Sequence, residues 1–251
     1  ALSERGADAD FEFINLDLNG AALSNVRFGP EATPDATIPL VEVRWRWEGF
    51  SPRLHFLRVV RPRLHFRMDE GGRVSAGSLE RLSGGAPGRS RPSIPAIELE
   101  ILEGQALIDT PFGPLTASLQ SSGTIGRDFS ALGEIARTSR AGQAYALEAG
   151  TADLVIVSRD ETIAFRINAS ANALTWDSAR VAAPALRILG RAPLDLARYD
   201  IEVTSRAASF RGDGITAQAI TAAIGFEGIA RDTELVPETW AGEARGSAGE
   251  F

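Results

Sequence analysis

The sequence of 251 residues contains no cysteine and no lysine, and it has only two histidines and one methionine. Without cysteine, neither disulfide bonds nor thiolate metal sites can form. All 26 basic residues are arginines, and 33 acidic residues outnumber them, so the formal net charge is −7. Proteins that bind the phosphates of nucleic acids need a basic face, so this charge balance argues against a nucleic-acid partner.

Long hydrophobic runs are also lacking, because no apolar stretch approaches the roughly 20 residues of a membrane-spanning helix. Residues 1–10 are polar and charged, which is not the pattern of a signal peptide. We expect the chain to be a fragment of a longer protein whose export or anchoring segment lies outside it. Apolar residues make up 44% of the chain and charged residues 24%, so a folded domain is expected.

Alternation of apolar and polar residues dominates the chain and is typical of strands with one apolar face. The clearest segments are 40–48, 62–69 and 162–173. At about 3.3 Å per residue, the last of these would form a strand of about 40 Å. Their apolar positions include Val41, Val43, Trp45, Trp47, Leu64, Phe66, Met68, Ile163, Phe165 and Ile167.

Strands with one apolar and one polar face favour antiparallel pairing through short turns. A β-sandwich or a closed barrel is the simplest fold for such strands. The segment 162–173 is longer than the strands of those folds usually are, so it fits them less well. We therefore expect a mainly β protein, in which a long, curved antiparallel sheet leaves an open apolar groove. One or two short helices are expected, at residues 129–140 and 1–9.

The domain organisation follows from composition. We expect a single β-groove domain over residues 1–235. The segment 83–95 is rich in glycine, serine and proline, which predicts a mobile loop inside this domain. Residues 236–251 are polar, which predicts a disordered tail.

The pentapeptide Pro-Arg-Leu-His-Phe occurs twice, at residues 52–56 and 62–66, and carries both histidines. In a strand, His55 and His65 would lie beside arginines on the polar side, and Leu54, Phe56, Leu64 and Phe66 on the apolar side. A metal site needs histidines and carboxylates that converge. We therefore interpret the repeat as a repeated strand pattern, neither a metal site nor an acid–base pair.

Other catalytic motifs are absent from the sequence. No Gly-x-Ser-x-Gly is present, and the glycine-rich residues 84–88 are not followed by the Lys-Ser/Thr of a phosphate-binding loop. The acidic pairs Asp69/Glu70 and Asp160/Glu161 fall in predicted turns. We expect no enzyme, no cofactor and no metal. One alternative stays open, a β-sandwich glycan enzyme whose carboxylates are brought together only by folding.

Trp45 and Trp47 allow two interpretations. They can belong to an ordinary hydrophobic core, or they can line an apolar groove that receives acyl chains, since each buried methylene contributes about 0.8 kcal/mol. The second interpretation predicts a lipid-binding groove lined by Val41, Val43, Trp45, Trp47, Leu54, Phe56, Leu64, Phe66, Met68, Ile163, Phe165 and Ile167.

Several segments resemble a known family. Residues 16–20 (LDLNG), 23–29 (LSNVRFG), 41–47 (VEVRWRW), 57–75, Ser78-Leu79 and 107–115 (LIDTPFGPL) are similar to the AsmA-like superfamily of bridge-like lipid transfer proteins, and most similar to its YdbH branch. The similarity covers residues 11–125. Its motifs are strand patterns rather than catalytic signatures.

The resemblance implies a β-groove fold, an inner-membrane anchor and a body in the periplasm of a Gram-negative bacterium. It implies phospholipid movement between the inner and outer membranes and no catalytic residues. The partners would be phospholipid and, through segments outside this chain, the membrane. Family members are several times longer than this chain. The alternative is a scaffold related to TamB, which would receive strands of outer-membrane proteins by strand addition.

Overall fold

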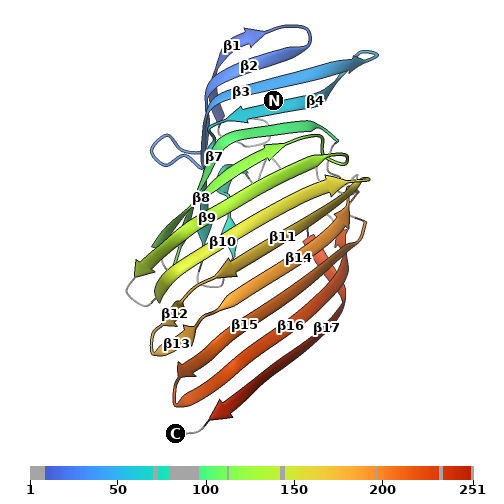
Figure 1. Cartoon of the computed structure of the whole chain (residues 1–251). Helices are drawn as coiled ribbons and strands as arrows, with labels where there is room; N and C mark the ends of the chain where they lie inside the picture. The colour runs from blue at the N-terminus through green and yellow to red at the C-terminus, as the bar shows by residue number, and fades with distance from the viewer. Residues whose placement is uncertain are drawn as a thin grey trace.

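The computed structural model describes residues 9–69, 73–79, 96–111, 113–141, 145–195, 197–231 and 234–249. Its strands belong to one mixed sheet of 17 strands (Figure 1). A short 3-10 turn, η2 (Gly77–Leu79), is the one helical element among these residues. The expected mainly β class is therefore confirmed.

In chain order, the strands are β1 (Ala9–Leu16), β2 (Gly20–Phe28), β3 (Ala36–Glu48), β4 (Ser51–Val60), β5 (Arg63–Met68), β6 (Val74–Ser75), β7 (Glu98–Thr110), β8 (Gly113–Ser122), β9 (Phe129–Ala141), β10 (Tyr145–Arg159), β11 (Thr162–Ser170), β12 (Ala173–Trp176), β13 (Ala179–Ala182), β14 (Ala185–Pro193), β15 (Tyr199–Gly212), β16 (Ile215–Arg231) and β17 (Glu234–Gly249).

Most strands pair antiparallel with the strand before and after them in the chain. Further antiparallel pairs, β3–β5, β10–β12, β11–β14 and β13–β15, join strands that are not consecutive in the chain. The parallel pairs are those of β7 with β4 and β5. The sheet was expected to be antiparallel, but it is mixed, because β7 runs in the same direction as β4 and β5. Residues 80–95 lie outside the described residues, and with them the expected mobile loop at 83–95.

The helix expected at residues 129–140 is wrong. This segment is β9, which pairs with β8 on one side and β10 on the other. Phe129, Ala131, Gly133 and Ile135 alternate with polar or exposed residues, so the segment suits a strand between two partners. Ala9, the last residue of the other expected helix, begins β1, and residues 1–8 lie outside the description.

The disordered tail expected at residues 236–251 is also wrong. Glu234–Gly249 forms β17, which pairs with β16 along almost its whole length. Backbone hydrogen bonds to a neighbouring strand do not require apolar side chains, so a polar segment can complete a sheet edge. Residues 250 and 251 lie outside the described part of the chain.

Two rows of left-handed residues cross the sheet. Asn25, Arg61 and Glu103 form the first row, with φ near 50°. Arg61 and Glu103 hold matching positions of the parallel pairing, since Val60 lies opposite Leu102 and Arg63 opposite Gln105. A left-handed residue in a strand inserts a kink and reverses the alternation of faces. Ile101 and Gly104 consequently lie on the same face of the sheet. Their cross-strand partners in β8 are Ser121 and Leu119, respectively.

The second row consists of Ala149, Ala183 and Ala219, again with φ near 50°. Between the first two lies Asn172, whose N–H donates to the carbonyl of Glu148 and whose own carbonyl accepts from Ala183. This row interrupts the long strand expected over 162–173, which becomes β11 and β12. As at the first row, the kink lets the apolar residues continue on one face of the sheet.

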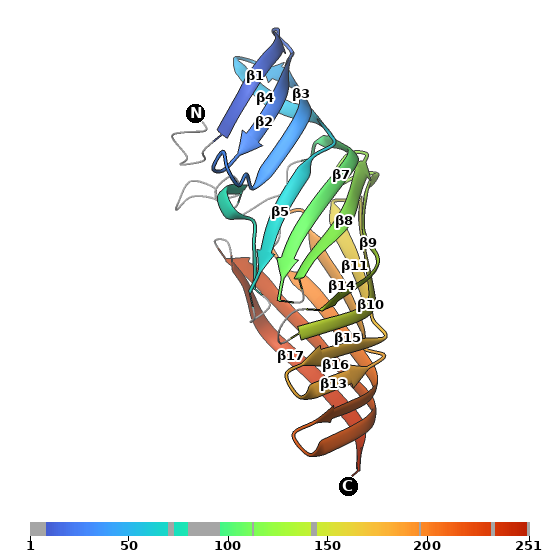
Figure 2. The same cartoon turned by 90° about the vertical axis from the view of Figure 1, so that its left-hand side faces the viewer.

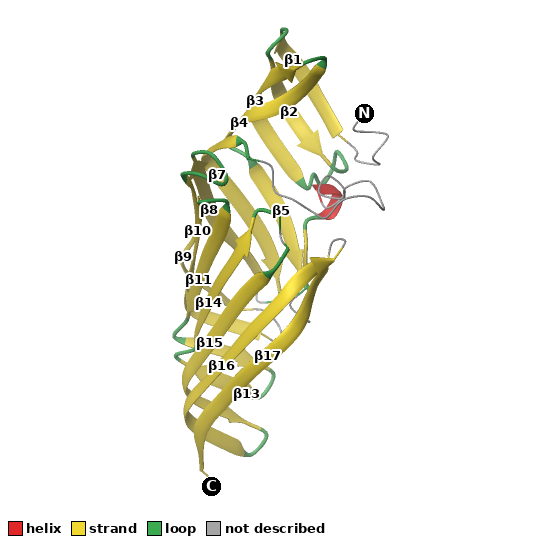
Figure 3. Ribbon diagram, turned by 90° about the vertical axis from the view of Figure 1, so that its right-hand side faces the viewer, coloured by secondary structure: helices red, strands yellow, loops and turns green. Residues whose placement is uncertain are grey.

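The molecule is an elongated, curved sheet with β1–β4 at one end and the C-terminus at the other (Figures 1 and 2). Its accessible surface is 16285 Å², whereas a compact protein of this mass exposes about 10,700 Å². The largest buried cluster is small, centred on Ile97, Ile125 and Phe129. One layer of strands, coloured yellow in Figure 3, therefore forms most of the described structure.

Candidate functional site

One face of the sheet carries an uninterrupted apolar surface across β10, β11, β14, β15 and β16. Directly paired residues of neighbouring strands lie on the same face. The pairing aligns a central row of five residues, one from each strand: Leu154, Ile167, Ile188, Val203 and Ile224. We call this surface the apolar face.

The rows on either side extend the apolar face. One consists of Ile156, Phe165, Gly190, Ile201 and Phe226, and the other of Ala152, Ala169, Leu186, Ser205 and Ala222. None of these positions carries a charge. Leu186 and Ile224 are each 37% exposed, so solvent reaches this face of the sheet.

A hollow of about 500 Å³ lies at the second row of left-handed residues, and its lining is almost entirely apolar. Leu147, Leu174, Trp176 and Val181 line it from one side of the kink, and Leu186 from the other. Gly150 leaves room for the side chain of Leu147, because a Cβ at this position would lie 2.8 Å from it. The kink thus joins two apolar stretches into one concave surface.

Ile163 lies on the same side of β11 as Phe165 and Ile167, but it packs against the buried cluster of Ile97, Ile125 and Phe129. Phe165 and Ile167 lie on the apolar face. Sequence reasoning omitted their cross-strand neighbours in β10 and β14, Leu154 and Ile188, from the predicted site. The alternation of apolar residues in both strands was the available signal. What the sequence did not supply was the pairing that brings the three strands side by side.

A second apolar hollow, of about 350 Å³, lies where β3 meets β4. Val43, Trp45, Trp47 and Leu54 line it, together with Pro52. Both indole N–H groups donate to the carbonyl of Leu18, with N···O distances of 2.8 Å for Trp45 and 2.7 Å for Trp47. Four of the predicted residues are therefore brought together, in an ordered arrangement. Val41 precedes them in β3 and is buried.

Phe56 was predicted on the apolar side, and the structure corrects this. Phe56 pairs with Arg44, whereas Leu54 pairs with Trp45, so His55 is an extra residue that forms a β-bulge. The bulge puts Leu54 and Phe56 on opposite faces of the sheet. The guanidinium groups of Arg44 and Arg58 lie 4.9 and 5.4 Å from the centre of the Phe56 ring.

The remaining predicted residues, Leu64, Phe66 and Met68, lie along β5. Leu64 pairs with Ala106 of β7, and Phe66 pairs with Ile108. All three are half-buried. Because the alternation reverses at Arg61 and Glu103, Leu64, Phe66 and Met68 lie on the same face of the sheet as Val59 and Ile101, which precede the kink.

The two histidines have different surroundings. His65 Nε2 lies 2.6 Å from Asp109 Oδ2, in a pair that bridges β5 and β7. His55 lies at the bulge of β4, and its buried Nδ1 contacts no hydrogen-bonding partner within the described residues. The described parts of the chain contain no cluster of three histidine or acidic residues that could hold a metal ion.

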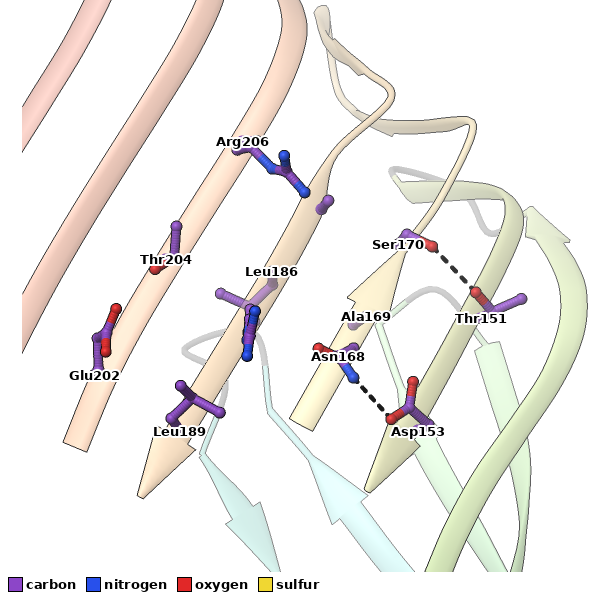
Figure 4. A pocket seen from close by; sticks show the side chains of 12 residues that line it. Thr151, Asp153, Asn168, Ala169, Ser170, Leu186, Leu189, Glu202, Thr204 and Arg206 are labelled. Atoms are coloured by element: carbon purple, nitrogen blue, oxygen red, sulfur yellow. Dashed lines mark hydrogen bonds between the residues drawn. The ribbon is translucent and has the colours of Figure 1, made fainter. Parts of the chain in front are cut away.

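The opposite face of the sheet is polar. Figure 4 shows one of its hollows, of about 590 Å³, in which Asn168 donates to Asp153 and Thr151 bonds to Ser170. Arg58 illustrates the pairing of charges between strands on this face. Arg58 donates to Glu100 of β7 at 2.6 Å and to Glu42 of β3 at 3.1 Å, and its bond to Glu100 raises the arginine pKa.

Asp35 is a buried carboxylate that joins η2 to the start of β3. It accepts hydrogen bonds from the backbone N–H and the hydroxyl of Ser78, both at 2.9 Å, and lies 3.3 Å from Arg67 Nη1. Burial alone would raise the pKa of Asp35, but the bonds from Ser78 and Arg67 outweigh it and lower the pKa. Because its carboxylate oxygens accept hydrogen bonds from Ser78 and Arg67, Asp35 serves as a structural anchor.

No family model, curated protein or solved structure matches this chain. Among the described residues, no helix has both the length and the apolar character of a membrane span. The candidate site therefore rests on the chain's own geometry, an uncharged apolar face on a single layer of strands.

Proposed function

We propose that this chain is a periplasmic segment of a bridge-like lipid transfer protein. In this proposal the apolar face forms a groove that holds phospholipid acyl chains as they pass between the inner and outer membranes. The observation that carries it is the three adjacent rows of uncharged residues from β10 to β16, which solvent reaches. The resemblance of residues 11–125 to the AsmA-like superfamily supports the same function, with an inner-membrane anchor elsewhere in the protein.

The physical basis is hydrophobic and non-specific. Each methylene removed from water gains about 0.8 kcal/mol when it is fully buried, and less on an open surface. No charged or strongly polar side chain interrupts the central rows, so no single position would hold an acyl chain in place. A bound chain can then move from strand to strand at little cost, while its charged head group stays in water. This is the behaviour that a conduit requires, and it needs no catalytic residue.

The experiment is lipid analysis of protein purified without detergent. Native mass spectrometry of the gently isolated chain should detect bound phospholipid, and organic extraction should recover it in a fixed ratio to protein. A maltose-binding protein carried through the same preparation controls for lipid carried over from the membrane. Protein that remains lipid-free, and that also fails to take up a fluorescent fatty acid, would contradict the proposal.

Strand addition is a second candidate, favoured by the free edge of β17. This strand has 16 residues and, within the described residues, pairs only with β16. A long edge strand presents unpaired backbone groups to which another strand can bond. The partner would be a strand of an unfolded outer-membrane protein, as in scaffolds related to TamB.

The absence of cysteine makes this candidate easy to test. A single cysteine at the edge, Thr239→Cys, should crosslink to a cysteine-bearing outer-membrane strand peptide. The matched control is Ser130→Cys in β9, which is also exposed but already has a partner strand on each side. Equal crosslinking of the two variants would argue against strand addition.

A further inference from the structure

Two hairpin turns meet at the N-terminal end of the sheet. One joins β1 to β2 at residues 17–19, and the other joins β3 to β4 at residues 49–50. The backbone N–H of Trp45 donates to the carbonyl of Asn19 at 2.9 Å, and the indoles of Trp45 and Trp47 donate to Leu18. These bonds hold the turns together as one end of the elongated molecule, at the top of Figure 1.

Large apolar side chains gather at this end without being covered. Phe50 is 101% exposed, Leu18 78%, Leu16 65% and Trp47 50%. We call these four residues the apical patch. Single exposed apolar residues are ordinary on a protein surface, but several at one protruding end mark an interaction site.

The chemistry of the patch suits a phospholipid bilayer. An indole N–H that enters the membrane without a partner is costly, but that of Trp47 already bonds to Leu18, so the ring can move into the acyl boundary. Arg46 lies on the other side of β3 and has no ion-pair partner within the described residues, whereas Arg53 pairs with Glu48. The positive charge of Arg46 would be attracted to anionic head groups at the membrane surface, whereas the carboxylate of Asp17, in the turn that carries Leu18, would oppose that attraction.

We propose that the apical patch is a membrane-docking site that inserts Phe50, Leu18 and the ring of Trp47 into the interfacial region of an anionic phospholipid bilayer. The patch is a different surface from the rows of β10–β16. Membrane docking can therefore occur without acyl-chain binding, and acyl-chain binding can occur without docking.

Vesicle flotation tests the proposal directly. The chain should float with vesicles of phosphatidylcholine and phosphatidylglycerol in a ratio of about three to one, and less with phosphatidylcholine alone. The double variant Leu18→Asp/Phe50→Asp should lower the vesicle affinity at least about tenfold, because two apolar contacts are replaced by charges. Brominated lipid should quench tryptophan fluorescence in the wild-type chain and much less in this variant.

The matched control is Ile215→Asp. Ile215 is also exposed and follows a hairpin turn, between β15 and β16, at the far end of the molecule in Figure 1. Ile215→Asp should bind vesicles like the wild type, and circular dichroism should show both variants folded. Three results would overturn the proposal: no flotation of the wild-type chain, an equal loss in both variants, or a dimer that the Leu18→Asp/Phe50→Asp variant dissociates without any vesicle binding.

Discussion

The ring of Phe165 in β11 occupies the space that a side chain at Gly190 of β14 would fill. The two residues are direct cross-strand partners, and a Cβ built on Gly190 overlaps the ring. The glycine therefore leaves room for the aromatic ring of Phe165 in the middle of the apolar face.

Gly190→Ala should lower the free energy of unfolding by about 1–3 kcal/mol, because the ring of Phe165 must move away. Urea denaturation measures the change. Phe165→Leu removes the clashing ring, so Gly190→Ala should cost much less in the Phe165→Leu background than in the wild type. Additive effects of the two substitutions would show that the ring does not depend on the glycine.

Acidification should remove the contribution of Asp35 to stability. Its pKa is lowered in the folded protein, so its stabilising effect is fully present above the unfolded pKa of about 3.8 and is lost as the pH falls through the lower folded value. Asp35→Asn should destabilise the protein at neutral pH by about 1–3 kcal/mol and flatten the acid limb of the stability profile. Denaturation at pH 7, 4 and 3 checks this, and an unchanged acid limb in the variant would contradict it.

Arg58 should matter more to stability than Arg53. Arg58→Gln leaves the half-buried Glu42 and Glu100, on either side of position 58, without their cation, which should cost about 1–2 kcal/mol. Arg53→Gln removes an exposed ion pair with Glu48 and should cost no more than about 0.5 kcal/mol. Thermal unfolding of the two variants in parallel compares them, and similar midpoints would count against the assigned role of Arg58.

A charge on the apolar face should weaken acyl-chain binding. Leu154 and Val157 both lie in β10, but they face opposite sides of the sheet, and Val157 is exposed. Leu154→Glu should lower the affinity for a fluorescent fatty acid about tenfold or more, whereas Val157→Glu should leave it unchanged. Circular dichroism verifies that both variants fold. An equal effect of the two substitutions would mean that the opposite face also binds.

Replacing the histidines should leave acyl-chain binding intact. His55→Gln and His65→Gln change a bulge residue and a partner of Asp109, neither of which belongs to the apolar face. Phe66→Glu, beside Ile108, should reduce binding in the same assay if the apolar surface of β5 contributes. If the histidine variants lost binding and Phe66→Glu retained it, the assignment of faces would be reversed.

Particular residues show how far sequence reasoning reached. The alternation around Phe165 predicted both the strand and the face on which the ring lies, because side-chain direction in a regular strand depends only on position. The same reasoning failed at Phe56, since a bulge at His55 shifts the alternation by one residue. A bulge depends on the register of the neighbouring strand, and that register leaves no local mark in the sequence.

Residues 129–140 show a second kind of limit. Their apolar residues fit a helical spacing and an alternating spacing almost equally well, and only the pairing with β8 and β10 selects the strand. Residues 236–249 have too few apolar side chains to predict a strand, yet β16 supplies the hydrogen bonds that order them. In both cases the neighbouring strand decides the local structure.

The sequence by itself determined that the protein is built of strands with one apolar and one polar face, because that alternation is a local property of the chain. It also excluded thiolate chemistry, because the chain has no cysteine. Only the tertiary structure decided that the strands form one mixed sheet and that Leu154, Phe165, Ile188, Val203 and Ile224 share a face. Pairing and register are long-range choices, made by backbone hydrogen bonds between segments that local patterns do not connect.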